Sequence, residues 1–259
     1  MQSRQGRGTG GLYTCSMAGS VFYKLGKIAG VQVRKARWMW ESVAGSEAEA
    51  IQAEHAVGRD MAAVVLEETP RDSDHATQAL LDDIGGRLAG VVRNRLHRFQ
   101  MIAIEVDRPT AFALPGGFIF VARSLVHVCH RNNDDIAFVL GHEMAHVIRR
   151  HAVERLLQQK VVNALTLASP SKGALTSWIR KLGFQGLERA YSQDEEFEAD
   201  ELAVLLMRAA GFDPAGAIRV LQCLGDLDRS PDSLGLNRYL STHPPIVDRV
   251  KRLRRLAAG

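Results

Sequence analysis

Apolar residues recur every three or four positions through most of the chain, and this period predicts a mainly helical protein. Polar N-cap residues or an Asp-Pro pair precede several of these periodic stretches, as expected where helices begin. The predicted helices run over residues 46–68, 73–96, from about 122, from 132 through the following apolar period, 174–189, 192–209, 213–227 and from 245 onward.

One stretch has a different pattern. Residues 99–106 alternate with β-branched side chains and predict a strand. Two short apolar runs, Ala111–Leu114 and Phe118–Val121, flank a Pro-Gly-Gly turn and predict a hairpin whose second strand lies at the sheet edge. The fold class is therefore mainly helical α+β, with a small sheet beside the helix that begins near residue 132.

That helix carries His142, Glu143 and His146 in the order His-Glu-Met-Ala-His. Its apolar period predicts a largely buried helix, on which residues i and i+4 share one face. Two imidazoles on a buried face need partners, and one divalent metal ion satisfies both. The spacing is that of the metalloprotease zinc motif, in which the histidines bind zinc and the glutamate activates water. The alternative, two histidines on an ordinary helix, is less favoured in this context.

Catalytic zinc usually has three protein ligands and one open position. The extended motif that ends in a third histidine is excluded, because Arg149 and Ala152 stand at its glycine and histidine positions. His151 lies five residues past His146 and points to another side of the helix, so we expect it to pack or to form hydrogen bonds.

A second helix, predicted to begin at Ser192 or Asp194, offers carboxylates. Glu196 and Asp200 are spaced i and i+4 and share a face. We assign Glu196 to zinc and expect Asp200 to accept a hydrogen bond from a zinc-binding histidine. The alternative is an ordinary acidic helix start, which would be preferred without the first motif.

These segments together resemble the gluzincin zinc metallopeptidases of the prenyl-protease, HtpX and BepA family. The resemblance rests on GHEMAH, on YSQDEEFEAD, on TAFALPGGFIF, on the segment DIAFVLG before the first motif, and on STHPP followed by Arg249, in consistent order over about residues 47–255. It implies a zincin-like metallopeptidase fold and a soluble, BepA-like member.

The resemblance also implies one Zn²⁺ per chain at His142, His146 and Glu196, with Glu143 as general base. The sequence departs from the family pattern at two positions that are not metal ligands. Thr110 replaces the usual Asn and Gln193 replaces the Arg after Ser192. Both departures concern the positioning of substrate.

With 259 residues the chain fits one metallopeptidase domain, residues 41–259, after a basic and partly disordered N-terminal arm, residues 1–40. The net charge of +4 comes from this arm, which has seven basic residues and no acidic one. The near-neutral remainder argues against nucleic acid as a partner. Residues 17–40 could dock on protein, which we favour, or on an anionic membrane surface.

No stretch approaches eighteen consecutive apolar residues, so we expect no transmembrane segment, and no clear signal peptide is evident. The three cysteines, Cys15, Cys129 and Cys223, are too few and too far apart for a disulfide framework. They favour a reducing, cytoplasmic location. The run from His127 to His130 contains one cysteine between two histidines, and we expect ordinary packing there rather than a metal cluster.

The expected activity is zinc-dependent endopeptidase cleavage of extended or unfolded polypeptides, as in protein quality control. His243 is the first candidate to stabilise the oxyanion or to occupy the open zinc position, and Tyr191 and Tyr239 are weaker candidates. Residues Gly117, Phe118, Ile119 and Phe120 would bind substrate by β-augmentation. Two alternatives remain: a zinc-stabilised chaperone or adaptor that binds extended chains with little or no proteolysis, and a zinc hydrolase that does not cleave peptides.

Overall fold

The computed structural model describes residues 46–151, 153–154, 191–228 and 246–257. The predicted arm and the predicted 174–189 helix lie outside these residues. The described helices are α2 (Glu47–Glu68), α3 (His75–Val91), α4 (Arg123–Val128), α5 (Asn133–Ile148), α9 (Gln193–Ala209), α10 (Ala215–Asp228) and α12 (Ile246–Ala257). The strands are β1 (Gln100–Ile104), β2 (Ala111–Leu114) and β3 (Phe118–Ala122), with a 3-10 turn at Pro115–Gly117. The predicted fold class, mainly helical with a small sheet, is confirmed.

The three strands form one sheet in the order β1-β3-β2. β2 and β3 pair antiparallel around the Pro-Gly-Gly turn, so the predicted hairpin is confirmed. The backbone at Gly116 and Gly117 has φ values of 74° and 91°, in the left-handed region that glycine enters at little cost. β1 pairs with β3 in parallel.

The prediction that Phe118–Val121 is an edge strand is wrong. β3 is hydrogen-bonded to β1 on one side and to β2 on the other, so its backbone is already paired on both sides. Residues 118–121 form a continuous apolar run, which suits a central strand buried on both faces. The substrate-binding role predicted for Gly117, Phe118, Ile119 and Phe120 therefore loses its physical basis.

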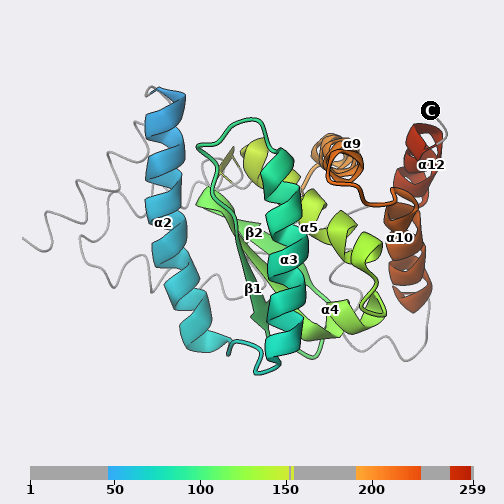
Figure 1. The fold of residues 1–259 in the computed structure, drawn as a ribbon, viewed down its shortest axis with the longest axis horizontal. Helices are drawn as coiled ribbons and strands as arrows, with labels where there is room; N and C mark the ends of the chain where they lie inside the picture. The colour runs from blue at the N-terminus through green and yellow to red at the C-terminus, as the bar shows by residue number, and fades with distance from the viewer. Residues whose placement is uncertain (1–45, 152, 155–190, 229–245, 258–259) are drawn as a thin grey trace, which may run out of the picture.

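The sheet lies between two helical layers (Figure 1). Side chains alternate along each strand between the two faces, as strand geometry requires. In β1, Met101 and Ala103 join the core under α3 and α5, whereas Ile102 and Ile104 join the core under α2. α2 thus covers one face of the sheet, and α3 and α5 cover the other.

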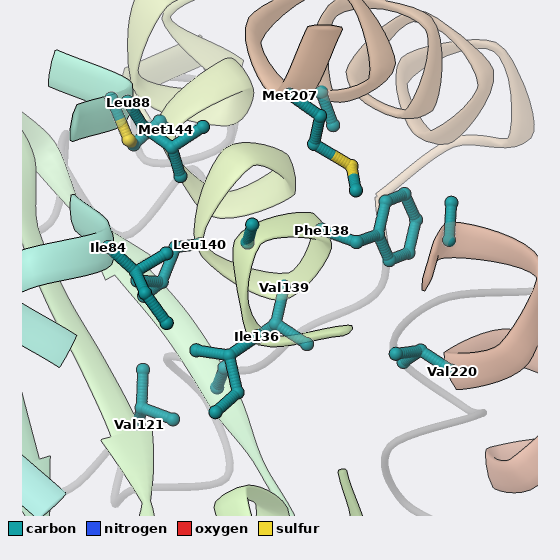
Figure 2. Packing of buried hydrophobic residues seen from close by; sticks show 14 of the residues in the cluster. Ile84, Leu88, Val121, Ile136, Phe138, Val139, Leu140, Met144, Met207 and Val220 are labelled. Atoms are coloured by element: carbon teal, nitrogen blue, oxygen red, sulfur yellow. The ribbon is translucent and has the colours of Figure 1, made fainter. Parts of the chain in front are cut away.

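α5 is the central helix of the molecule, because thirteen of its sixteen residues are buried. Ile136, Leu140 and Met144 lie with Ile84 and Leu88 of α3 and Val121 of β3, whereas Phe138 lies on the side of Met207 and Val220 (Figure 2). The helix therefore packs against the sheet and α3 on one side and against α9 and α10 on the other. A helix apolar around most of its surface is expected in such a place.

Most helices begin at or near the residues where the sequence predicts their start. Asn132 accepts hydrogen bonds from Asp134 and Asp135 at the start of α5, and Ser192 forms a capping box with Glu195 at the start of α9. α3 differs, because Asp74 rather than Ser73 is its N-cap and the helix ends at Val91, not Leu96.

The early end of α3 has a local cause. The Asn94 side chain accepts a hydrogen bond from the backbone of Leu96, and this gives the chain an alternative to helical bonding. Across the part of the chain that is described, no helix combines the length and the apolar character needed to cross a membrane.

Candidate metal centre

Two helices that are far apart in sequence approach closely at the motif. α5 and α9 pack directly against each other. At their crossing a Cβ on Gly141 would lie 3.4 Å from the Cα of Ala203, so the two small residues let the backbones come near. This close approach lets His142 and His146 of α5 reach the carboxylate of Glu196 on α9.

The two imidazole rings and the carboxylate of Glu196 converge. The Nε2 atoms of His142 and His146 lie 3.1 Å apart. Glu196 places Oε2 at 3.5 Å from the first imidazole and Oε1 at 3.4 Å from the second. All three side chains are buried, and Glu196 is fully so.

These separations fit a zinc ion. Two ligand atoms that each lie about 2.1 Å from a tetrahedral zinc are about 3.4 Å apart, which is close to the observed spacings. Two imidazoles and a carboxylate are also a donor set that catalytic zinc uses. Within the described ranges, His142, His146 and Glu196 form the one group of three ligand-type side chains close enough to share an ion.

Asp200 supports the first imidazole. Its Oδ1 lies 3.0 Å from Nδ1 of His142, on the ring edge opposite the converging Nε2. Burial works against a charge on His142, but Glu196 and Asp200 outweigh it and raise the pKa of this imidazole to about 9. The surroundings thus favour positive charge where the three ligand atoms meet.

The second imidazole has its own partners. Nδ1 of His146 hydrogen-bonds Nδ1 of His151 at 2.9 Å, and His151 Nε2 lies 3.4 Å from Oε2 of Glu198. The ring of Tyr191 stacks on His146 with a centroid separation of 3.7 Å. His151 is thus a buried hydrogen-bonding residue and not part of the converging group. Tyr191, a predicted oxyanion candidate, is buried against the imidazole.

Arg249 of α12 is part of the same buried cluster, and its role was not foreseen from the sequence. Its Nε and Nη2 donate to the two oxygens of Asp200 at 2.8 and 2.7 Å. Its Nη1 lies 2.9 Å from Oε2 of Glu196. Burial raises the pKa of Asp200, but Arg249 and His142 outweigh it and the pKa is lowered. A signal was present, because Arg249 is a charge beside the buried Val250 and Leu253 of α12.

The other predicted site residues are placed as follows. Glu143 follows His142 on α5 and is 1% exposed. His243 and Tyr239 lie outside the described residues. Gly117 and the residues after it belong to the central strand and its turn.

The run from His127 to His130 does not form a metal-binding group among the described residues. Cys129 is buried in the hydrophobic core, whereas His127 and His130 are exposed. Burial, with smaller contributions from Asp135 and Cys223, raises the pKa of the Cys129 thiol to about 12. A thiol with so high a pKa is a poor metal ligand and a poor nucleophile, because both roles require the thiolate.

Curated proteins similar to this chain are named as a metalloendopeptidase, a metalloprotease and a protease. "Mitochondrial metalloendopeptidase OMA1" of Schizosaccharomyces pombe is 30% identical over 186 residues, covering 70% of this chain and 53% of the relative. "Metalloprotease LoiP" of Escherichia coli is 29% identical over 191 residues, 71% of each protein. "Beta-barrel assembly-enhancing protease" of Yersinia pestis is 28% identical over 160 residues, 58% of this chain and 33% of the relative.

The chain spans between 31% and 53% of the length of three mitochondrial relatives that it matches, from fission yeast, budding yeast and Arabidopsis thaliana. The family model described as "Peptidase family M48" matches residues 75–257, which include α5, α9 and α12. Most of the chain is thus covered, including every residue of the buried cluster. On this match, and on the convergence of two imidazoles and a carboxylate between α5 and α9, the chain belongs to peptidase family M48.

Proposed function

We propose that this protein is a zinc-dependent endopeptidase that hydrolyses peptide bonds in extended or unfolded polypeptide segments. The observation that carries the proposal is the convergence of His142, His146 and Glu196, whose ligand atoms all lie within 4.8 Å of one another. Family membership and the names of the relatives support the same reaction class. A role in protein quality control is part of the proposal.

Zinc held by these three residues would supply a Lewis acid for the scissile carbonyl and a water of lowered pKa. The protein's own groups divide the remaining work. Glu143, next to the ligand His142, accepts the proton of the attacking water on a carboxylate oxygen and delivers it to the leaving amide nitrogen. Asp200, whose Oδ1 lies 3.0 Å from Nδ1 of His142, would hold this ring so that Nε2 stays available to zinc. His243 remains our candidate to stabilise the oxyanion or to occupy the open position.

The first experiment is incubation of the purified protein with unfolded casein, with and without a chelator. We expect cleavage that the chelator abolishes and added zinc restores. Binding of casein without cleavage would favour the chaperone or adaptor alternative. Hydrolysis of a non-peptide ester with intact casein would favour a zinc hydrolase of another class.

Glu143→Gln tests the proposed base. We expect about one zinc per chain in this variant but casein cleavage reduced at least about a hundredfold, because a general base contributes that much or more. Glu154→Gln is the matched control, since it removes the same charge from an exposed residue. Unchanged turnover in Glu143→Gln would remove this residue from its role.

A further inference from the structure

α12 contributes one buried charge to the interior. Arg249 is 1% exposed and is among the largest fully buried side chains of the described residues. The neighbouring basic residues of α12, Lys251 and Arg252, are exposed. A guanidinium is moved out of water at a large cost, which hydrogen-bonded carboxylates in good geometry can offset. The contacts of Arg249 with Asp200 and Glu196 meet that requirement.

The geometry divides the two oxygens of Glu196 between different partners. Arg249 Nη1 lies 2.9 Å from Oε2, which also lies 3.5 Å from Nε2 of His142. Oε1 is the oxygen directed to His146, at 3.4 Å from its Nε2. A carboxylate held through one oxygen by a planar guanidinium has a fixed orientation, because the fork of the arginine is rigid. With Oε2 held beside Arg249 and His142, Oε1 faces His146.

The same guanidinium also orients Asp200, the residue that supports the imidazole of His142. Its two bonds to Asp200 are bidentate, at 2.8 and 2.7 Å. Asp200 in turn lies 3.0 Å from Nδ1 of His142. One arginine thus orients a ligand directly, through Glu196, and a second ligand indirectly, through Asp200. Arg249 also balances the charge of two buried carboxylates that lie one helical turn apart on α9.

We propose that Arg249 is a positioning residue of the metal centre: it orients Glu196 and Asp200 so that zinc binds tightly, and this makes α12 a necessary part of the site. The inference rests on the zinc site of the proposed function. Partners that orient metal ligands in this way typically contribute ten- to hundredfold to metal affinity.

The test is the zinc dissociation constant of the full chain, measured by competition with a chromophoric chelator, together with the rise in Tm that zinc causes. For Arg249→Ala we expect zinc binding about ten- to hundredfold weaker and a smaller zinc-induced rise in Tm. Arg249→Lys should also bind zinc more weakly than wild type, because an ammonium lacks the planar fork that reaches both carboxylates.

Arg252→Ala is the matched control. Arg252 also joins α12 to α9, through Glu201, but both side chains are substantially exposed. Its removal should leave zinc affinity unchanged, so a general loosening of α12 is separated from a loss of orientation at the site. A third measurement adds millimolar guanidinium to Arg249→Ala. Guanidinium should restore part of the zinc affinity, whereas an equal concentration of sodium chloride should not.

Several results would overturn the inference. These are wild-type zinc affinity in Arg249→Ala, full affinity in Arg249→Lys, or an equal loss in Arg252→Ala. If Arg249→Ala does not fold, Arg249→Lys and its comparison with Arg252→Ala decide the question. Failure of the proposed function is distinguishable, because it would appear in the wild-type chain itself, as absent zinc binding or as zinc binding without casein cleavage, whereas failure of this inference appears only in the zinc affinities of the variants.

Discussion

His146 illustrates how one residue's role depends on the atom that its neighbours leave available. Its Nε2 faces Nε2 of His142 and Oε1 of Glu196, whereas its Nδ1 hydrogen-bonds Nδ1 of His151. An imidazole that offers Nε2 to a metal carries its proton on Nδ1, so His146 is the donor and His151 Nδ1 the acceptor. His151 then carries its own proton on Nε2, which lies 3.4 Å from Glu198.

We therefore predict that His151→Ala weakens zinc binding by about tenfold, because the tautomer and ring orientation of His146 are no longer fixed. The measurement is again competition with a chelator. His127→Ala is the control, since this histidine is exposed on α4. Equal zinc affinity in wild type and His151→Ala would show that the His151 contact is packing only.

At the scale of elements, α2 contacts the hairpin turn closely because Gly58 has no side chain. A Cβ on Gly58 of α2 would lie 1.8 Å from the carbonyl oxygen of Pro115, so the helix rests directly on the backbone of the turn. His55, one turn earlier on α2, hydrogen-bonds the carbonyl of Gly116 at 2.9 Å. The turn is thereby held between α2 and the sheet.

Gly58→Ala should therefore destabilise the protein by about 1–3 kcal/mol, although alanine is normally the better helix residue. Gly86→Ala is a matched control on α3, where a Cβ would meet nothing within 4 Å. That variant should be stabilised by up to about 1 kcal/mol. Urea unfolding of both variants checks the pair, and a stabilised Gly58→Ala would contradict the close contact.

The N-cap of α3 gives a pH dependence. The Thr77 hydroxyl and the Ala76 amide donate to Asp74, and these bonds lower the pKa of its carboxyl from the ordinary value of an aspartate. A depressed pKa in the folded state contributes stability above the unfolded value, and this stability is lost as pH falls through the folded value. The Tm difference between wild type and Asp74→Ala should be constant near neutral pH and should shrink below about pH 4. A constant difference down to pH 3 would contradict this assignment.

The elements that the sequence predicted well are those set by local interactions. Asn132 and Ser192 satisfy the first backbone amides of α5 and α9, and the apolar periods that follow fix which faces are buried. The central position of β3 was missed because its parallel pairing with β1 joins residues eighteen positions apart, such as Gln100 and Phe118. No local pattern records such a pairing.

At the scale of the whole molecule, the candidate site is assembled from helices far apart in sequence. The spacing of His142, His146, Glu196 and Asp200 within their own helices was sufficient to place them on common faces. The place of Arg249 depends on how α12 packs on α9, because 49 residues separate it from Asp200. Among the five basic residues of α12, the sequence marks Arg249 by the family resemblance and by its apolar neighbours, but its contacts with Asp200 and Glu196 are set by tertiary packing.

The central claim is that α5 and α9 hold a single zinc ion through two imidazoles and one carboxylate. The most direct measurement is the zinc content of the purified chain and of two single variants, by mass spectrometry of the metal after dialysis. We predict about one zinc per chain in wild type. Glu196→Ala should lose the metal, whereas Glu195→Ala should keep it, even though removal of the Glu195 capping contact weakens the start of α9. Equal zinc content in Glu196→Ala and Glu195→Ala, or none in wild type, would contradict the account.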